Sequence, residues 1–238
     1  MLLWSEHGAV KGRQFNPGRC IGSMADRLRV LERRDIDELI ILDISATPNN
    51  RAPRFEEVSA LCDSLFMPVT IGGGVRSVAD IRRLLAGGAD KVAIGTMACD
   101  RPEIIGEGAK RFGSQAVVVS IDVLRGRVHT ACGRHDSGRH PVAWAREVES
   151  RGAGEILLTS VDRDGMMGGY DLELIREVSD AVAIPVVAAG GCGDYAHMAA
   201  ALSAGAHAVA VGAAFQFKEL TPKGGARYLR EQGFQVRI

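Results

Sequence analysis

The chain carries an internal repeat, and this repeat constrains the fold more than any other feature of the sequence. The segment Pro68-Val-Thr-Ile-Gly-Gly-Gly74 returns 117 positions later as Pro185-Val-Val-Ala-Ala-Gly-Gly191. Single glycines recur at the same offset, Gly88 with Gly205 and Gly95 with Gly212. A period of about half the chain indicates a duplicated unit. The sequence therefore predicts one domain over residues 1–238, built from two similar halves at about 1–112 and 113–238.

Short apolar runs alternate with longer amphipathic stretches along the chain. Each run is apolar on both faces and leads into a glycine or an aspartate; the runs are Leu39–Leu42, Pro68–Ile71, Lys91–Ile94, Ala116–Ile121, Glu155–Ser160, Pro185–Ala188 and Ala208–Val211. Helical patterns lie between them, at 78–85, 102–111, 141–151 and 172–182. Strands that are apolar on both faces are typical of parallel sheets covered by helices.

These seven strands and a short one at the start make eight, which predicts an α/β fold of the (βα)8 TIM-barrel type. The length of 238 residues is close to the usual size of about 250 for this fold. Only Met1–Trp4 precede the polar segment Ser5–Gly8, so the first strand is expected to be truncated, with a true start upstream of residue 1. A doubly wound open sheet is the weaker alternative, because it gives no reason for a two-fold repeat.

Composition excludes several classes of function. Lys+Arg and Asp+Glu are equal at 29 each, so no basic excess is present to bind a nucleic-acid backbone. The five cysteines are scattered with no Cys-x-x-Cys pair, which argues against a disulfide framework or a zinc site and favours a reducing compartment. No signal peptide or membrane-spanning run is visible. We therefore expect a cytoplasmic protein without membrane, nucleic-acid, metal or cofactor binding.

Glycine-rich turns follow two of the predicted strands, and a second small-residue turn follows each about twenty residues later. Glycine lets a phosphate approach the backbone N–H groups closely. The turns of the first half contain Gly73, Gly74, Gly95 and Thr96, and those of the second half contain Gly190, Gly191, Gly212 and Ala213. Either the glycines only permit tight turns, or each half holds one phosphate. The duplication favours phosphate binding, and hence a ligand with a phosphate at each end.

Aspartates also stand at the ends of predicted strands, where barrel enzymes place their working residues. Asp122 follows a long apolar run and is expected at the barrel rim, where a carboxylate can act as a general acid or base. The alternative is a helix N-cap or an ion pair with Arg125. For Asp43 and Asp164 the functional and structural interpretations are evenly balanced.

Together these residues resemble the cyclase subunit of imidazole glycerol phosphate synthase. The resemblance covers nearly the whole chain, and its most specific segments are Phe112–Asp122, Gly152–Gly165, Gly169–Asp171, Ile36–Asp43 and Gly88–Val92. The segment Gly169–Asp171 favours the cyclase over the sister isomerase of the histidine pathway, which is the third interpretation of this chain.

The resemblance implies a glutamine amidotransferase in which a separate glutaminase subunit forms a heterodimer with the barrel. Ammonia would pass through the barrel and attack a bis-phosphorylated ribonucleotide, giving imidazole glycerol phosphate and an aminoimidazole carboxamide ribotide. It also implies residue roles. Asp122 matches a catalytic carboxylate; Lys11, Asp43, Thr159 and Asp164 join the glycine turns in binding substrate; Glu38, Lys91 and Glu155 match a channel gate; and Asp90 matches a position that communicates with the glutaminase.

The sequence departs from the family pattern at several positions. Leu3 stands where the family has its other catalytic aspartate, Gly95 where it usually has asparagine, and Met166 where it usually has threonine. The remaining arginine of the gate would lie before residue 1. A related branch with an apolar residue at the position of Leu3 serves sugar amidotransferases in surface-polysaccharide biosynthesis. A non-cyclising, ammonia-conducting barrel of that kind is therefore the alternative to a cyclase.

Overall fold

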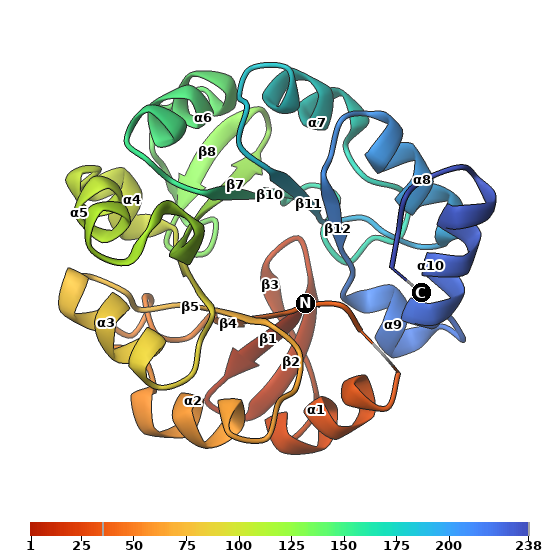
Figure 1. Cartoon of the computed structure of the whole chain (residues 1–238), viewed down its shortest axis with the longest axis horizontal. Helices are drawn as coiled ribbons and strands as arrows, with labels where there is room; N and C mark the ends of the chain where they lie inside the picture. The colour runs from red at the N-terminus through yellow and green to blue at the C-terminus, as the bar shows by residue number, and fades with distance from the viewer. Residues whose placement is uncertain (35, 238) are drawn as a thin grey trace.

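The protein, seen here in a computed structural model, is described over residues 1–34 and 36–237. Eight parallel strands form a ring with helices outside it (Figure 1). In chain order the strands are β1 (Leu2–Ser5), β4 (Leu39–Asp43), β5 (Val69–Gly72), β6 (Lys91–Ile94), β7 (Val117–Leu124), β10 (Glu155–Ser160), β11 (Val186–Ala189) and β12 (Ala208–Ala210). The predicted (βα)8 barrel is confirmed.

Helices follow the strands and cover the outside of the ring. They are α1 (Met24–Glu32), α2 (Phe55–Cys62), α3 (Val78–Ala86), α4 (Thr96–Asp100), α5 (Glu103–Phe112), α6 (Pro141–Ser150), α7 (Leu172–Ser179), α8 (Tyr195–Ser203), α9 (Ala213–Phe217) and α10 (Pro222–Glu231), with a 3-10 turn at Ser114–Ala116. Local sequence sets several helix starts. Ser77 and Asp80 form a reciprocal capping box at α3, and Thr221 caps α10 just before Pro222.

The two ends of the sheet meet between β12 and β1. Neighbouring strands pair in parallel register from β1 through β4 to β12, and the main-chain nitrogen of Met1 donates a hydrogen bond of 2.8 Å to the carbonyl oxygen of Val211. β1 begins further along the barrel than β4, since Leu2 lies opposite Ile41 while β4 starts at Leu39. The short first strand thus pairs only with the C-terminal part of its neighbour.

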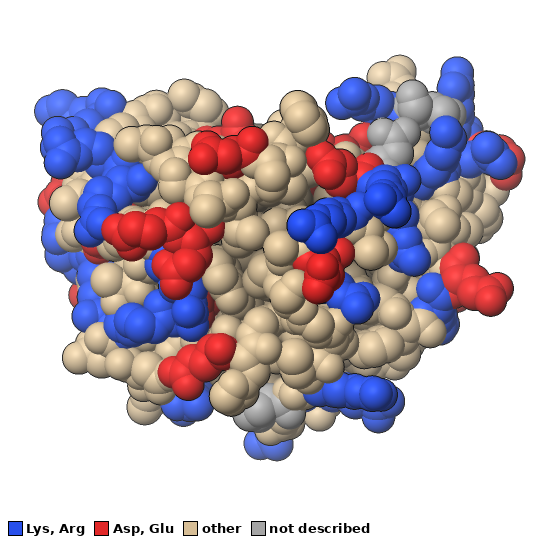
Figure 2. All heavy atoms as spheres, turned by 90° about the horizontal axis from the view of Figure 1, so that it is seen from below, with Lys and Arg blue, Asp and Glu red and all other residues tan. Residues whose placement is uncertain are grey.

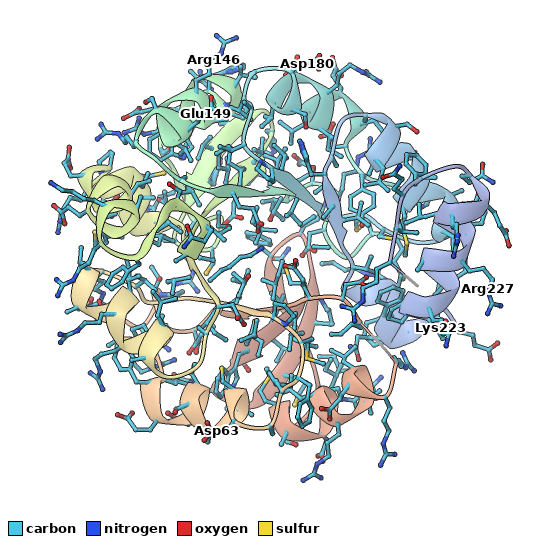
Figure 3. All side chains as sticks on the ribbon, in the orientation of Figure 1. Asp63, Arg146, Glu149, Asp180, Lys223 and Arg227 are labelled. Atoms are coloured by element: carbon cyan, nitrogen blue, oxygen red, sulfur yellow. The ribbon has the colours of Figure 1, made fainter. Side chains whose placement is uncertain are left out.

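The strands are apolar on both faces because each face meets a different core. Small and aliphatic side chains fill the barrel interior: Ala93, Val118, Leu157, Val187, Ala189 and Ala210. A larger cluster, which includes the fully buried Trp144, lies between strands and helices. Charged side chains lie on the outer rim and point away from the axis, as Figure 3 shows for Asp63, Arg146, Asp180, Lys223 and Arg227. Acidic and basic side chains are interspersed on the face seen in Figure 2.

The sequence repeat is a repeat of structure. Helix α3 at Val78–Ala86 and helix α8 at Tyr195–Ser203 correspond residue for residue at the offset of 117, as do α4 and α9. Several boundaries differ from expectation by one residue, and two differ by three. Helix α7 ends at Ser179 rather than at 182, and β7 extends past Ile121 to Leu124, because its end pairs with another strand.

Two hairpins rise from the C-terminal end of the barrel. β2 (Gly8–Arg13) and β3 (Asn16–Gly22) follow β1, and β8 (Arg127–Thr130) and β9 (His135–Asp136) follow β7. His129 and His135 lie on this second hairpin, and His140 stands at the start of helix α6. In the described ranges, no helix is long and apolar enough to cross a membrane.

The turn after β5 packs backbone against backbone, which gives a stability test. A Cβ at Gly73, where φ is 105°, would collide with the carbonyl oxygen of Asp43, whereas at Gly126, where φ is 75°, nothing lies within 4 Å. We expect Gly126→Ala to lower the free energy of unfolding by about 1 kcal/mol, from backbone strain alone. Gly73→Ala adds a steric clash and should cost about 3 kcal/mol. Urea unfolding measures both, and equal losses would contradict the packing described.

Candidate active site

A pocket of about 570 Å³ opens at the C-terminal end of the barrel. The β2–β3 hairpin, the strand ends and the loop after β8 form its walls. Many of the predicted site residues line it together: Asp43, Gly73, Gly74, Gly95, Thr96, Asp122, Thr159 and Asp164. Leu3 of β1 also lines the pocket and contributes an apolar side chain to its wall.

Asp122 lies in this pocket on the inward side of β7. The Ser120 hydroxyl donates to its Oδ1 at 3.2 Å, and the Thr159 hydroxyl also hydrogen-bonds to the carboxylate. Burial raises the pKa of Asp122 to about 6, and the nearby charge of Asp164 adds to the rise against the effect of the two hydroxyls. Such a carboxyl group exchanges protons close to neutral pH. Among the described residues Arg125 and Asp122 form no ion pair within 4.0 Å, so that alternative is not realised.

The turns of the first half face the pocket. Gly73 and Gly74 have positive φ and no room for a Cβ, so the turn itself requires glycine at both positions, whether or not a phosphate binds there. The Thr96 hydroxyl oxygen accepts a hydrogen bond of 2.9 Å from the Ala131 nitrogen, which leaves its proton available to a ligand. Gly95 has a negative φ of −108°, so conformation alone does not require glycine there.

Asp43 is held by internal partners. Its Oδ1 accepts hydrogen bonds from Ser45 and Ala46, and its Oδ2 lies 2.6 Å from Arg51 Nη2 and 3.0 Å from Arg54 Nε. Burial opposes its charge, but the hydrogen bonds from Arg51 and Ser45 hold the pKa of Asp43 below its usual range. This carboxylate therefore organises the loop between β4 and α2 and is a poor proton donor.

The turns of the second half lie outside the lining of this pocket. Gly190, Gly191, Gly212 and Ala213 are absent from its described lining residues, and so is Lys11. The Lys11 side chain is buried against Gly212, where a Cβ would collide with its Nζ. Burial lowers the pKa of Lys11, against the effect of Asp164. The two sets of turns are thus not joined in one open cavity in this conformation.

The β2–β3 hairpin lies over the loop that follows β10. The Gln14 nitrogen donates to the Asp164 carbonyl oxygen at 2.9 Å, and Gln14 Nε2 donates to that of Asp162 at 3.0 Å. A Cβ at Gly165 would collide with the Gly12 carbonyl oxygen. These contacts hold the β2–β3 hairpin against the loop after β10.

The three gate residues meet at the opposite, N-terminal end of the barrel. Lys91 Nζ lies 2.7 Å from Glu155 Oε2 and 3.1 Å from Glu38 Oε2. Burial opposes the charge, but the two carboxylates raise the pKa of Lys91 overall. Asp90 accepts a hydrogen bond of 2.8 Å from the Val69 nitrogen. A second cavity of about 440 Å³ lies at this end and is lined in part by Glu38 and Glu155.

Sequence reasoning missed some residues of the site. Ser120 was not singled out, although it stands two positions before Asp122 on the same strand and hence on the same face. Arg51 and Arg54 were also missed, because nothing in the sequence shows that the chain after Asp43 folds back onto it.

A (βα)8 barrel with a polar pocket and a carboxyl group of raised pKa at its C-terminal end has the layout of a barrel enzyme. The chain belongs to the family of histidine biosynthesis proteins, which matches residues 5–221. It is 44% identical over 233 residues to the imidazole glycerol phosphate synthase subunit HisF of Pyrobaculum aerophilum, an alignment that covers 96% of this chain and 92% of that protein. The predicted family is confirmed.

The contacts of Asp43 predict a pH-dependent loss of stability in Asp43→Asn. Its folded-state pKa is lowered, so its contribution is present above the unfolded pKa of about 4 and is lost as pH falls through the folded value. We expect Asp43→Asn to cost about 2 kcal/mol at pH 7, with partly exposed arginines limiting the loss, and much less near pH 2.

Urea unfolding at both pH values measures this effect. The control is Asp63→Asn, which removes an exposed carboxylate on the outer rim and should change stability by less than about 0.5 kcal/mol. A loss in Asp43→Asn that is the same at pH 2 and pH 7 would show that charge plays no part.

Proposed function

We propose that this chain is the cyclase subunit of an imidazole glycerol phosphate synthase, a lyase of histidine biosynthesis acting in the cytoplasm. The observation that carries the proposal is Asp122, a carboxyl group with a pKa of about 6 inside the pocket of a barrel that is 44% identical to a HisF subunit. The substrate would be a bis-phosphorylated ribonucleotide, and the second reactant would be ammonia.

Two sets of turns at the C-terminal end of the barrel support substrate binding, one inside the pocket and one beside it. One phosphate would lie at Gly73, Gly74 and Thr96, where backbone N–H groups and a hydroxyl face the cavity. The other would lie at Gly190, Gly191, Gly212 and Ala213, where the buried Lys11 ammonium supplies a positive charge. Because the β2–β3 hairpin lies over the loop after β10, it would have to shift for both ends to bind at once.

The reaction needs protons to move as bonds form and break. Ammonia adds to the ketone carbon of the substrate and water leaves; the new nitrogen then closes the imidazole ring as the aminoimidazole ribotide departs. Asp122 is held in place by Ser120 and Thr159, and its pKa suits it to donate and accept protons in these steps.

The partner would be a glutaminase subunit that docks at the N-terminal end of the barrel. Lys91 bridges Glu38 and Glu155 there, so this ring of charges would admit ammonia only when the bridge opens. Beyond it the interior is lined by small apolar side chains such as Ala93, Val118 and Ala210. Such a lining favours neutral ammonia over ammonium, because burying an unpaired charge is costly.

One observation favours a second candidate. Leu3 lines the pocket where the family pattern has a second catalytic aspartate. An ammonia-conducting barrel that supports a sugar amidotransferase would need the gate and the interior but not that carboxylate. The name of the 44% identical relative favours the cyclase.

The first test is ammonium-driven consumption of the bis-phosphorylated ribonucleotide by the purified chain. We expect turnover in the wild type, and in Asp122→Asn a fall in kcat of about 10² to 10⁴-fold, since the amide cannot transfer the proton. Asp136→Asn removes an exposed carboxylate on β9 outside this pocket and serves as the control. Absence of turnover in folded wild-type protein would reject the cyclase in favour of the ammonia-conducting barrel.

The second test is complex formation with the glutaminase subunit. We expect a one-to-one heterodimer by analytical ultracentrifugation. Asp90→Asn should weaken it by about tenfold through loss of a charge at the docking face, while its amide oxygen keeps the bond to Val69. Lys223→Gln, on the outer rim, is the control (Figure 3). Equal affinity of the wild type and both variants would argue against docking through this face.

A further inference from the structure

The pocket is lined by four aspartates, and their contacts divide them into two kinds. Asp43 is paired with Arg51 and Arg54, and Asp162 accepts a hydrogen bond of 2.8 Å from the main chain of Arg125 at the rim. Both therefore have structural partners. Asp122 and Asp164 line the same cavity, and within the described part of the chain neither carboxylate forms an ion pair within 4.0 Å.

Asp164 is a buried carboxylate. Its exposed fraction is 7%, and its carboxylate accepts hydrogen bonds from the main-chain nitrogens of Gly165 and Phe15. Burial raises its pKa, while Lys11 and the two N–H groups oppose that rise. A group whose charged form receives N–H donors and faces a cation gives up its proton more readily than one that lacks them.

Asp122 has fewer groups that stabilise its charged form than Asp164 has. Among the described residues, only the hydroxyl groups of Ser120 and Thr159 bind its carboxylate, and burial keeps its pKa at about 6. The strands β7 and β10 are neighbours, with Asp122 opposite Thr159, so Asp164 follows a few residues after the strand that pairs with Asp122. The charge of Asp164 is near enough to raise the pKa of Asp122. The two groups thus form an interacting pair with different environments, which is how one site can hold both an acid and a base.

We propose that Asp164 is the second catalytic carboxylate of this pocket and acts as the base while Asp122 acts as the acid. The inference rests on the proposed cyclase function and assigns a role that Leu3 cannot fill, since β1 places only an apolar side chain in the pocket wall. Asp164 would then be more than a residue that binds substrate.

The ring-closing step shows how the pair would work. The nitrogen derived from ammonia forms a bond to the amidine carbon and loses one proton to the Asp164 carboxylate. The bond from that carbon to the departing aminoimidazole nitrogen breaks, its electron pair stays on the nitrogen, and Asp122 supplies a proton to it. Asp164 ends protonated and Asp122 ionised, so one proton exchanged with solvent at each group restores the starting state.

The assignment gives a defined pH dependence. Activity should rise as Asp164 loses its proton and fall as Asp122 loses its own through about pH 6, with both limbs belonging to the coupled pair. The charged and titratable groups near the pair are Lys11 on β2, Cys99 on α4 and Cys132 in the loop after β8, and Asp43 at the end of β4 lies near Cys132. Because Asp164 raises the pKa of Asp122, removing its charge should lower that pKa.

The experiment compares Asp164→Asn with Asp162→Asn, a matched change in the same loop two residues away. In ammonium-driven turnover we expect Asp164→Asn to lower kcat by about 100-fold or more and to abolish the acidic limb, with a smaller change in KM. Carboxyl-carbon NMR of the full chain should show the titration of Asp122 shifted to lower pH in Asp164→Asn but not in Asp162→Asn.

Each outcome decides the matter. A raised KM with unchanged kcat and an unchanged acidic limb would show that Asp164 only binds substrate, and would overturn the assignment while the cyclase stands. An unmoved titration of Asp122 in Asp164→Asn would overturn the pairing. Absence of turnover in the wild type would reject the cyclase and, with it, this catalytic role.

Discussion

Close contact between the backbones of successive strand-to-helix turns is the constraint on which this structure depends. A Cβ at Gly73 would strike the carbonyl oxygen of Asp43, and a Cβ at Gly190 would strike that of Ser160, which is the same contact in each half. Glycine at both positions lets each turn lie against the one before it. The C-terminal rim of the barrel is thereby closely packed at both glycine turns.

The sequence was sufficient to predict the barrel because its signals are local and repeated. Runs such as Lys91–Ile94 are apolar on both faces, and the offset between Gly73 and Gly190 survives as an offset between whole elements. Strand ends were less predictable. The extension of β7 to Leu124 depends on pairing with β8, which is a contact between segments and leaves no local signal.

The sequence predicts which residues belong to the candidate site, but not which side chains contact them. The pattern of strand ends identified Asp43, Asp122 and Asp164 alike, yet only the folded chain shows that Arg51 and Arg54 bind the first of them. That difference separates a carboxylate that organises a loop from those that can transfer protons. A sequence records which groups stand at the rim, whereas their pKa depends on neighbours brought in from other strands.

The two halves have a similar backbone arrangement, but they differ in the side chains at equivalent strand ends. The position of Asp43 in the first half is occupied by Ser160 in the second, whose hydroxyl bonds Asp171 at 3.3 Å. In the first half, the strand-end carboxylate of Asp43 therefore pairs with arginines and stabilises a loop. In the second half, Asp122 and Asp164 form no ion pair within 4.0 Å in the described chain. Duplication thus supplies two similar rims, and substitutions at equivalent positions, such as Asp43 and Ser160, give the two rims different hydrogen-bond partners.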